Sequence, residues 1–267
     1  MKRILFCFAL ICLGGFSLFG RPTQEINNRG TEKDVYIGGF EHNNQRIGIA
    51  RYWLNGEVVP ISDGNYFTTI SSMFVKDSDV YAAGYEYSGN DNNYQPYFKN
   101  TVAMYWKNDV RFTLTDGVYV AVAQSIFVVG EDIYVAGYEK SGIGGNNIAK
   151  YWKNGVAVDL TKRSSSARAI SIFVVGTDVY VAGNERKRGE EKFSAKYWKN
   201  GQEFILSDGK SNADTHSIFV LDGDVYVVGA QHNGRNWVAK YWENGIEFTI
   251  SNEQFNAVAY SVFVVKK

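Results

Sequence analysis

The chain repeats one pattern five times, and this periodicity constrains the fold more than any other feature of the sequence. Each copy holds an apolar run, a short turn, a second run that opens with aspartate, a loop and the motif Ala-Lys-Tyr-Trp-Lys-Asn-Gly or a variant of it. The aspartates are separated by 45, 53, 46 and 46 residues and are Asp34, Asp79, Asp132, Asp178 and Asp224. That period is typical of four short strands per propeller blade. We therefore expect an all-β, five-bladed β-propeller with four antiparallel strands in each blade.

The order of the strands within a blade follows from their polarity. In one copy we expect strands at 172–175, 179–185, 195–199 and 203–206, from the propeller axis outward. The first is apolar without alternation, as a strand buried on both faces should be, whereas the last carries a charged residue in every copy, as an edge strand should. Asn-Gly separates the last two strands in four copies, and this pair is typical of a two-residue hairpin turn.

The copies are offset from the blades, which suggests how the ring closes. The propeller is expected to span residues 33–267; it starts at Lys33 with the second strand of a blade and ends at 261–265 with a spare first strand. We expect this C-terminal strand to pair with the N-terminal blade. Such pairing would close the ring with backbone hydrogen bonds and complete a blade of four strands.

The first 20 residues are predicted to be a signal peptide. Lys2 and Arg3 precede an apolar stretch at 4–19, and small residues at Ser17 and Gly20 fit a cleavage site. Residues 21–32 are then a linker. The mature protein is expected to be exported, to the periplasm, the cell surface or the medium, with no membrane insertion of its own.

Cysteine use and net charge exclude several classes of function. Both cysteines, Cys7 and Cys12, lie in the predicted leader, so cleavage would leave no thiol for disulfides or catalysis. Lipoprotein processing at Cys12 is the less favoured alternative, because Ile11 stands where such signals have a small residue. The chain has 28 basic and 28 acidic residues, which provides no basic surface for nucleic acid.

Candidate ligand-binding residues were sought at one end of the propeller, called here the top end, which carries the loops between second and third strands and the crossovers between blades. These loops vary from seven to sixteen residues, and function on repeat scaffolds concentrates where loops vary. Side chains there that break the repeat are Trp237, Tyr260, His216, Asp214 and Arg168, with Tyr94 and Tyr97 in the longest loop. Aromatic rings beside polar groups suit sugar recognition.

Residues that recur in every copy are interpreted as structural. The tryptophan of each Tyr-Trp pair is expected in the core, and glutamates such as Glu139 are expected to pair with basic residues of the next strand, such as Lys150. The repeated aspartates are expected to bond within turns rather than to bind metal. No Ser-His-Asp set, metal-ligand cluster or phosphate loop is visible, so neither an enzyme nor a cofactor is expected.

The repeat motifs carry a family resemblance. The segments 149–155 and 171–175, with their copies, resemble exported tandem-repeat proteins of Gram-negative bacteria. In blade number and period the chain is also similar to five-bladed lectins of the tachylectin type, although it lacks a visible copy of their sugar-contact motif. We expect a monomeric, non-catalytic module that binds glycans. The alternative is a protein-interaction scaffold of the cell envelope, with an envelope or host protein as partner, and a glycan-active enzyme comes third.

Overall fold

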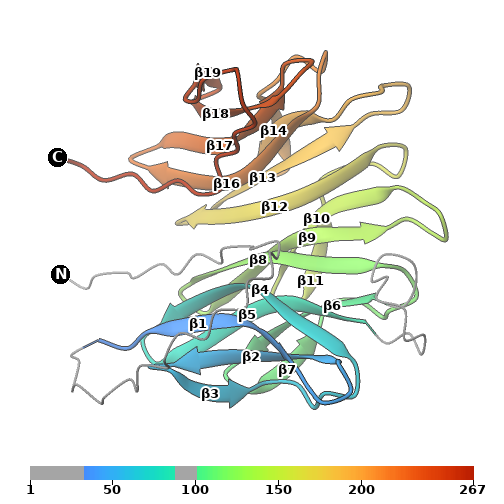
Figure 1. Ribbon diagram of the computed structural model, residues 1–267, viewed down its shortest axis with the longest axis vertical. Helices are drawn as coiled ribbons and strands as arrows, with labels where there is room; N and C mark the ends of the chain where they lie inside the picture. The colour runs from blue at the N-terminus through green and yellow to red at the C-terminus, as the bar shows by residue number, and fades with distance from the viewer. Residues whose placement is uncertain (1–32, 88–100) are drawn as a thin grey trace.

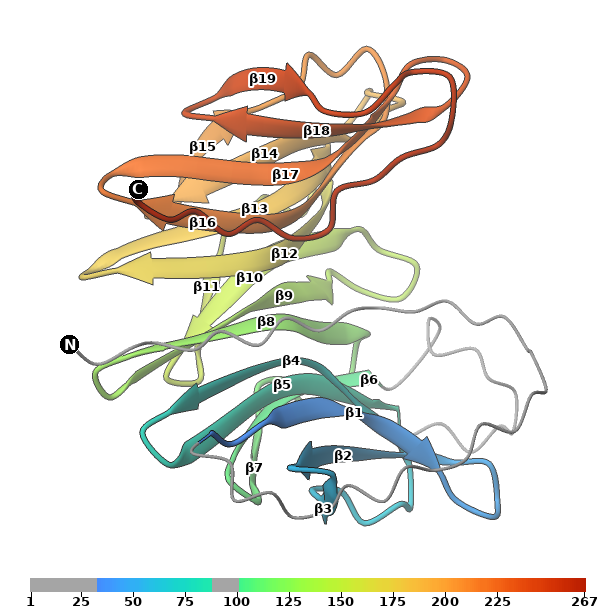
Figure 2. The same ribbon diagram turned by 60° about the vertical axis from the view of Figure 1, so that its left-hand side comes forward.

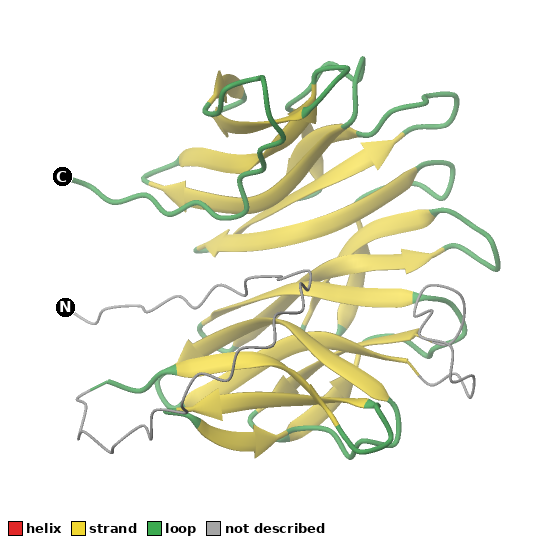
Figure 3. Ribbon diagram, in the orientation of Figure 1, coloured by secondary structure: helices red, strands yellow, loops and turns green. Residues whose placement is uncertain are grey.

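The computed structural model describes residues 33–87 and 101–267, and every regular element in these ranges is a β-strand (Figure 3). The strands form five antiparallel sheets, of which the first has three strands and the others have four. Each strand pairs with its neighbours in the chain, so every sheet is a simple meander. The described ranges offer no helix long and apolar enough to cross a membrane.

The strands of the five sheets have the following bounds. The first sheet contains β1 (Tyr36–His42), β2 (Gly48–Leu54) and β3 (Glu57–Pro60). The second contains β4 (Phe67–Lys76), β5 (Asp79–Tyr87), β6 (Thr101–Lys107) and β7 (Val110–Thr113). The third contains β8 (Ala121–Val129), β9 (Asp132–Lys140), β10 (Asn147–Lys153) and β11 (Val156–Asp159). The fourth contains β12 (Ser166–Val175), β13 (Asp178–Arg186), β14 (Ser194–Lys199) and β15 (Gln202–Ile205), and the fifth contains β16 (Ala213–Leu221), β17 (Asp224–His232), β18 (Trp237–Glu243) and β19 (Ile246–Thr249).

The five sheets are stacked side by side, with the first sheet at one end of the long axis and the fifth at the other (Figures 1 and 2). The all-β class, the four-strand meander and its order are as predicted. The closing strand is not shown: residues 261–265 lie outside the assigned strands, and β1 is paired with β2 alone. The C-terminal segment instead runs beside β16 (Figure 2), so ring closure stays a prediction.

The innermost strands begin earlier than the sequence suggested, at Ser166 for β12, and each contains a β-bulge. The pairing register shifts between Ile70 and Ser72 in β4, and at the same place in β8, β12 and β16. Opposite the bulge in the second sheet is Gly84, where an added Cβ would lie 1.9 Å from the carbonyl oxygen of Thr69. Glycine is therefore required there, since any side chain would meet the backbone of the bulged strand.

The Asn-Gly turns form as predicted. Asn154 and Gly155 both have positive φ, 51° and 83°, and the Asn-Gly pairs of the other sheets share this conformation. The Asn154 side chain also accepts a hydrogen bond from Ile133 N at 2.8 Å and donates one to Asp132 at 2.8 Å. Each turn thus anchors the hairpin to the start of the neighbouring strand.

Two sets of repeated side chains hold neighbouring sheets together. Trp106, Trp152, Trp198 and Trp242 are at most 1% exposed, which confirms the structural interpretation of the Tyr-Trp pairs for these four. Along the innermost strands, phenylalanine rings follow one another with centres 4.8 to 5.1 Å apart, in the order Phe74, Phe127, Phe173, Phe219 and Phe263. The last of these lies in the C-terminal segment, which therefore continues the series beyond β16.

Candidate functional site

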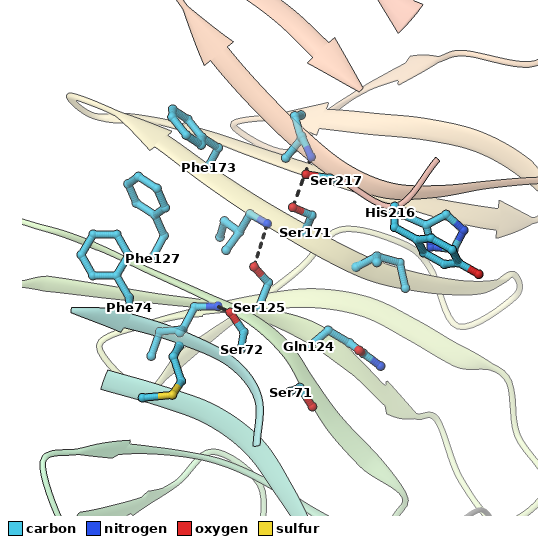
Figure 4. A pocket seen from close by; sticks show the side chains of 16 residues that line it. Ser71, Ser72, Phe74, Gln124, Ser125, Phe127, Ser171, Phe173, His216 and Ser217 are labelled. Atoms are coloured by element: carbon cyan, nitrogen blue, oxygen red, sulfur yellow. Dashed lines mark hydrogen bonds between the residues drawn. The ribbon is translucent and has the colours of Figure 1, made fainter. Parts of the chain in front are cut away.

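The innermost strands β4, β8, β12 and β16 line a cavity of about 130 Å³ that marks the central channel. Ser71, Gln124 and His216 lie toward one end of it, while the rings of Phe74 and Phe127 lie toward the other (Figure 4). The end with Ser71, Gln124 and His216 is the top end, since it is where the innermost strands begin.

The polar residues at this channel mouth are the bulge residues of their strands. The register shifts fall at Ser71, Gln124, Ile170 and His216, one per sheet. A bulge leaves its extra residue unpaired and re-aims the side chain. The scaffold thus places one side chain per sheet at the mouth, and the sequence varies which side chain it is. Sequence reasoning chose His216 and Tyr260 for this place, and both line the cavity.

His216 is half-buried at the mouth. Burial lowers the pKa of its imidazole below the ordinary value, and the nearby Asp214 carboxylate opposes this shift only partly. The His216 ring centre lies 4.9 Å from that of Tyr260. A neutral imidazole beside a phenol gives this side of the mouth hydrogen-bonding groups without a charge.

Arg168 and Asp214 serve contacts between sheets. The Arg168 guanidinium lies over the ring of Tyr138 in the third sheet, 5.4 Å from its centre. Asp214 accepts a short hydrogen bond from the Asn184 amide of the fourth sheet. These contacts give both residues a structural role that requires no ligand.

Trp237 begins β18 at the top end and is half-buried. Its ring lies edge-on to that of His232, with the centres 5.5 Å apart. Tyr94 and Tyr97 lie outside the described residues.

A larger hollow, of about 650 Å³, opens at the top end between the fourth and fifth sheets. Its walls are the crossover at 206–211, the end of β17 with the loop that follows, the adjoining parts of β18 and β19, and Glu253. Sequence reasoning missed this hollow. Its one signal is Gln231, which stands where four other copies have glutamate and which lines the wall.

The repeated acids are held by neighbouring strands, as expected. Lys150 Nζ lies 2.6 Å from Glu139 Oε2, and in the fourth sheet Lys196 Nζ lies 2.5 Å from Glu185 Oε2. The aspartates bond the Asn of the adjoining hairpin, not their own turn, and Lys153 and that amide lower the pKa of Asp132. Within residues 33–87 and 101–267 there is no cluster of three His, Cys, Asp or Glu side chains placed to hold a metal ion.

Comparisons with known proteins inform the fold alone. No family model matches the chain, and no curated protein matches it. Among solved structures 53 chains match. One is the acylaminoacyl peptidase of Pyrococcus horikoshii, matched over its β-propeller domain with a TM-score of 0.50 and 13% identity. The match covers 81% of this chain, which spans only 37% of the peptidase. At this identity the likeness supports a β-propeller-like arrangement of the five sheets.

Proposed function

We propose that the protein is an exported, non-catalytic binding module that recognises glycans through its top end. The observation that carries this proposal is the β-bulge, which recurs in four sheets and presents a different residue each time: Ser71, Gln124, Ile170 and His216. Packing alone would favour one residue type at equivalent places. A constant backbone with variable side chains is what recognition on a repeat scaffold requires.

The chemistry of the top end favours carbohydrate. Amide, hydroxyl and imidazole groups can exchange hydrogen bonds with sugar hydroxyls, while the rings of Trp237 and Tyr260 provide apolar faces for stacking. Tyr260 is 62% exposed, so its ring is accessible to a ligand.

A glycan array on the protein, followed by titration calorimetry with folded variants, tests the proposal. Trp237→Ala and Tyr260→Ala should each weaken binding by about 1–3 kcal/mol, as truncation of an aromatic hot spot does. Lys153→Ala and Lys199→Ala, at the opposite end, should leave it unchanged. Loss of binding in the second pair alone would move the site away from the top end.

A protein-interaction scaffold is the second candidate, favoured by the outermost strands. Val110, Val156 and Ile246 are each more than half exposed and occupy equivalent places, as the first residues of β7, β11 and β19. Recurrent exposed apolar residues suit a protein partner along the outer rim. If no glycan binds, a purified partner whose binding is lost on Val156→Ser plus Ile246→Ser would support this alternative.

We also propose that the five sheets are the blades of a closed propeller, completed by the C-terminal segment. The C-terminal segment follows the fifth sheet in the same way that β16 follows the fourth sheet. Ala257 N donates to Trp237 O of the fifth sheet at 2.8 Å, and Ala213 N at the start of β16 donates to Phe193 O, just before β14 of the fourth sheet, at 2.9 Å. The equivalence predicts a register in which Val264 pairs with Val35, as Val220 pairs with Val225.

A hydrogen-bond acceptor without a donor on β16 and an exposed valine before β1 support this register. The oxygens of Ser72, Ser125 and Ser171 each accept a hydrogen bond from a backbone N–H of the next sheet, whereas Ser217 Oγ is buried without a partner. The proposed strand would supply Val262 N. Just before β1, Val35 is 54% exposed, against 6% for Val225 in the fifth sheet.

Engineered disulfides test the closure. In a Cys7→Ser, Cys12→Ser background, Val35→Cys with Val264→Cys should oxidise to a cross-linked monomer, as should Val220→Cys with Val225→Cys in the fifth sheet. Ile37→Cys with Val264→Cys, out of register by two residues, should not, because its Cα atoms would be too far apart. A cross-linked dimer would assign β1 to a second copy, and failure of both β1 pairs would reject closure.

A further inference from the structure

We propose that the hollow between the fourth and fifth sheets is the place where one unit of an uncharged saccharide binds. The inference rests on the glycan-binding function proposed above and adds a second site at the same top end, with its ligand class. With about 650 Å³, the hollow falls within the roughly 300–1,000 Å³ typical of ligand pockets.

At the hollow the fifth sheet departs from the repeat. In the fourth sheet Lys196 is bonded to both Glu185 and Glu203, and its side chain is only 2% exposed. In the fifth sheet Gln231 replaces the first of these carboxylates, and Lys240 bonds Glu247 at 2.6 Å. The loop after Gln231 has seven residues, against nine in the fourth sheet. The substituted pair and the shorter loop distinguish this sheet from its neighbour.

Two groups in the wall are ready to hydrogen-bond a hydroxyl. The Gln231 amide donates to Ser211 Oγ at 3.1 Å, while its Oε1 is buried with no partner. Lys240 Nζ is bonded to Glu247 Oε1 and to Thr249 Oγ1 at 2.7 Å, and an ammonium has three donors. A sugar hydroxyl in the hollow can therefore accept from the third N–H of Lys240, and a rotation of the Gln231 amide would bring its unpartnered carbonyl oxygen within reach of the same hydroxyl.

The charges of the wall select against acidic sugars. Lys210 is paired with Asp208 at 3.2 Å and Lys240 with Glu247, so both ammonium groups already have a carboxylate. Glu253 has no ion pair among the described residues, which leaves an excess of one negative charge. A uronic or sialic acid would bring a second unpaired carboxylate near it, and like charges repel.

An aromatic pair borders the hollow. His232 lines the wall, and the ring of Trp237 lies edge-on to it with the centres 5.5 Å apart. An apolar ring face next to hydrogen-bonding groups is the arrangement that a pyranose requires. Trp237, selected from the sequence as the one tryptophan that the repeat does not demand, thereby lies next to this site.

Saturation-transfer NMR with defined sugars tests the site. The probes are the methyl glycosides of glucose, galactose and N-acetylglucosamine, with glucuronic and galacturonic acid as acidic counterparts. At least one neutral probe should bind, and at least tenfold more tightly than the acids. Gln231→Glu restores the residue of the other sheets, so its carboxylate should engage Lys240 and weaken the neutral probe at least tenfold. Glu139→Gln, the reverse change in the third sheet, should leave binding unchanged.

The results distinguish failure of the proposed site from failure of the proposed glycan-binding function. If a neutral probe binds and Gln231→Glu leaves its affinity unchanged, the site is wrong and glycan binding stands. If acids bind more tightly, the charge argument fails. If no sugar binds the unmodified protein, by NMR or on the array, both proposals fail. Thermal melts establish that Gln231→Glu is folded; if it is not, His232→Ala at the rim should cause the same loss.

Discussion

The rings of His216 and Tyr260 lie 4.9 Å apart, inclined by 49°, and join the innermost strand of the fifth sheet to the C-terminal segment. His216 is thereby enclosed, and burial lowers the pKa of its imidazole, with Asp214 opposing the shift. The neutral ring is the form that the folded protein prefers.

This preference predicts a loss of stability in acid. Above the unfolded-state pKa of about 6.5, His216 is neutral in both states and contributes no pH dependence. As the pH falls below that value the unfolded chain binds a proton before the folded chain does, so the free energy of unfolding decreases down to the lowered folded-state pKa. His216→Gln should therefore lose less stability than the unmodified protein between pH 7.5 and pH 5, measured by urea unfolding. Equal losses would show that His216 does not titrate differently on folding.

The glycines opposite the bulges should resist substitution. In Gly229→Ala the new Cβ would lie 1.9 Å from Asp214 O, so we expect a loss of about 2 kcal/mol or more. Gly39 occupies the same place in β1, where an added Cβ would meet only the Trp53 ring at 3.5 Å. If the proposed strand closes the ring, a carbonyl oxygen lies there too, and Gly39→Ala should be as costly. A nearly neutral Gly39→Ala, in urea unfolding, would argue for a free edge.

Ion pairs of the same sequence pattern should differ in their contribution to stability. Glu185→Ala leaves Lys196 buried with Glu203 as its remaining partner, and we expect a loss of about 3 kcal/mol. Glu41→Ala breaks a pair whose carboxylate side chain is 57% exposed, and the loss should be below about 1 kcal/mol. Chemical unfolding of both variants checks the contrast, which similar losses would contradict.

Deleting residues 261–267 should destabilise the fifth sheet. The deletion removes Phe263, whose ring centre lies 5.0 Å from that of Phe219, and exposes a side chain now 6% accessible. Uncovering one phenylalanine costs about 2–3 kcal/mol, and loss of a closing strand would add to this. An unchanged urea midpoint would mean that the segment contributes nothing to the folded state.

Much of the blade could be predicted because the signals are local. Asn154 and Gly155 determine a turn through their own backbone preferences, and the charged edge strands follow from polarity. The β-bulges could not be predicted, because a bulge depends on how two strands pair. Their trace in the sequence is Gly84 and its equivalents, whose role becomes clear only when the opposing carbonyl oxygen is placed.

The residues of the candidate site likewise include some that the sequence could identify and some whose role only the structure explains. Trp237 and His216 could be selected as departures from the repeat, and they lie at the top end as the meander required. Arg168 and Asp214 depart from it equally, but contacts with Tyr138 and Asn184 explain them, and those partners are 30 residues away in the chain.

By itself, the sequence determined the period, the strand order, the turns and the end of the sheets at which loops gather, since these depend on residues close together in the chain. The tertiary structure alone decided which irregular side chains face a neighbour and which face a hollow. Gln231 is a single amide in the sequence; its significance lies in its unpartnered Oε1 and in the hollow beside it, both set by how the fifth sheet packs against the crossover that precedes it.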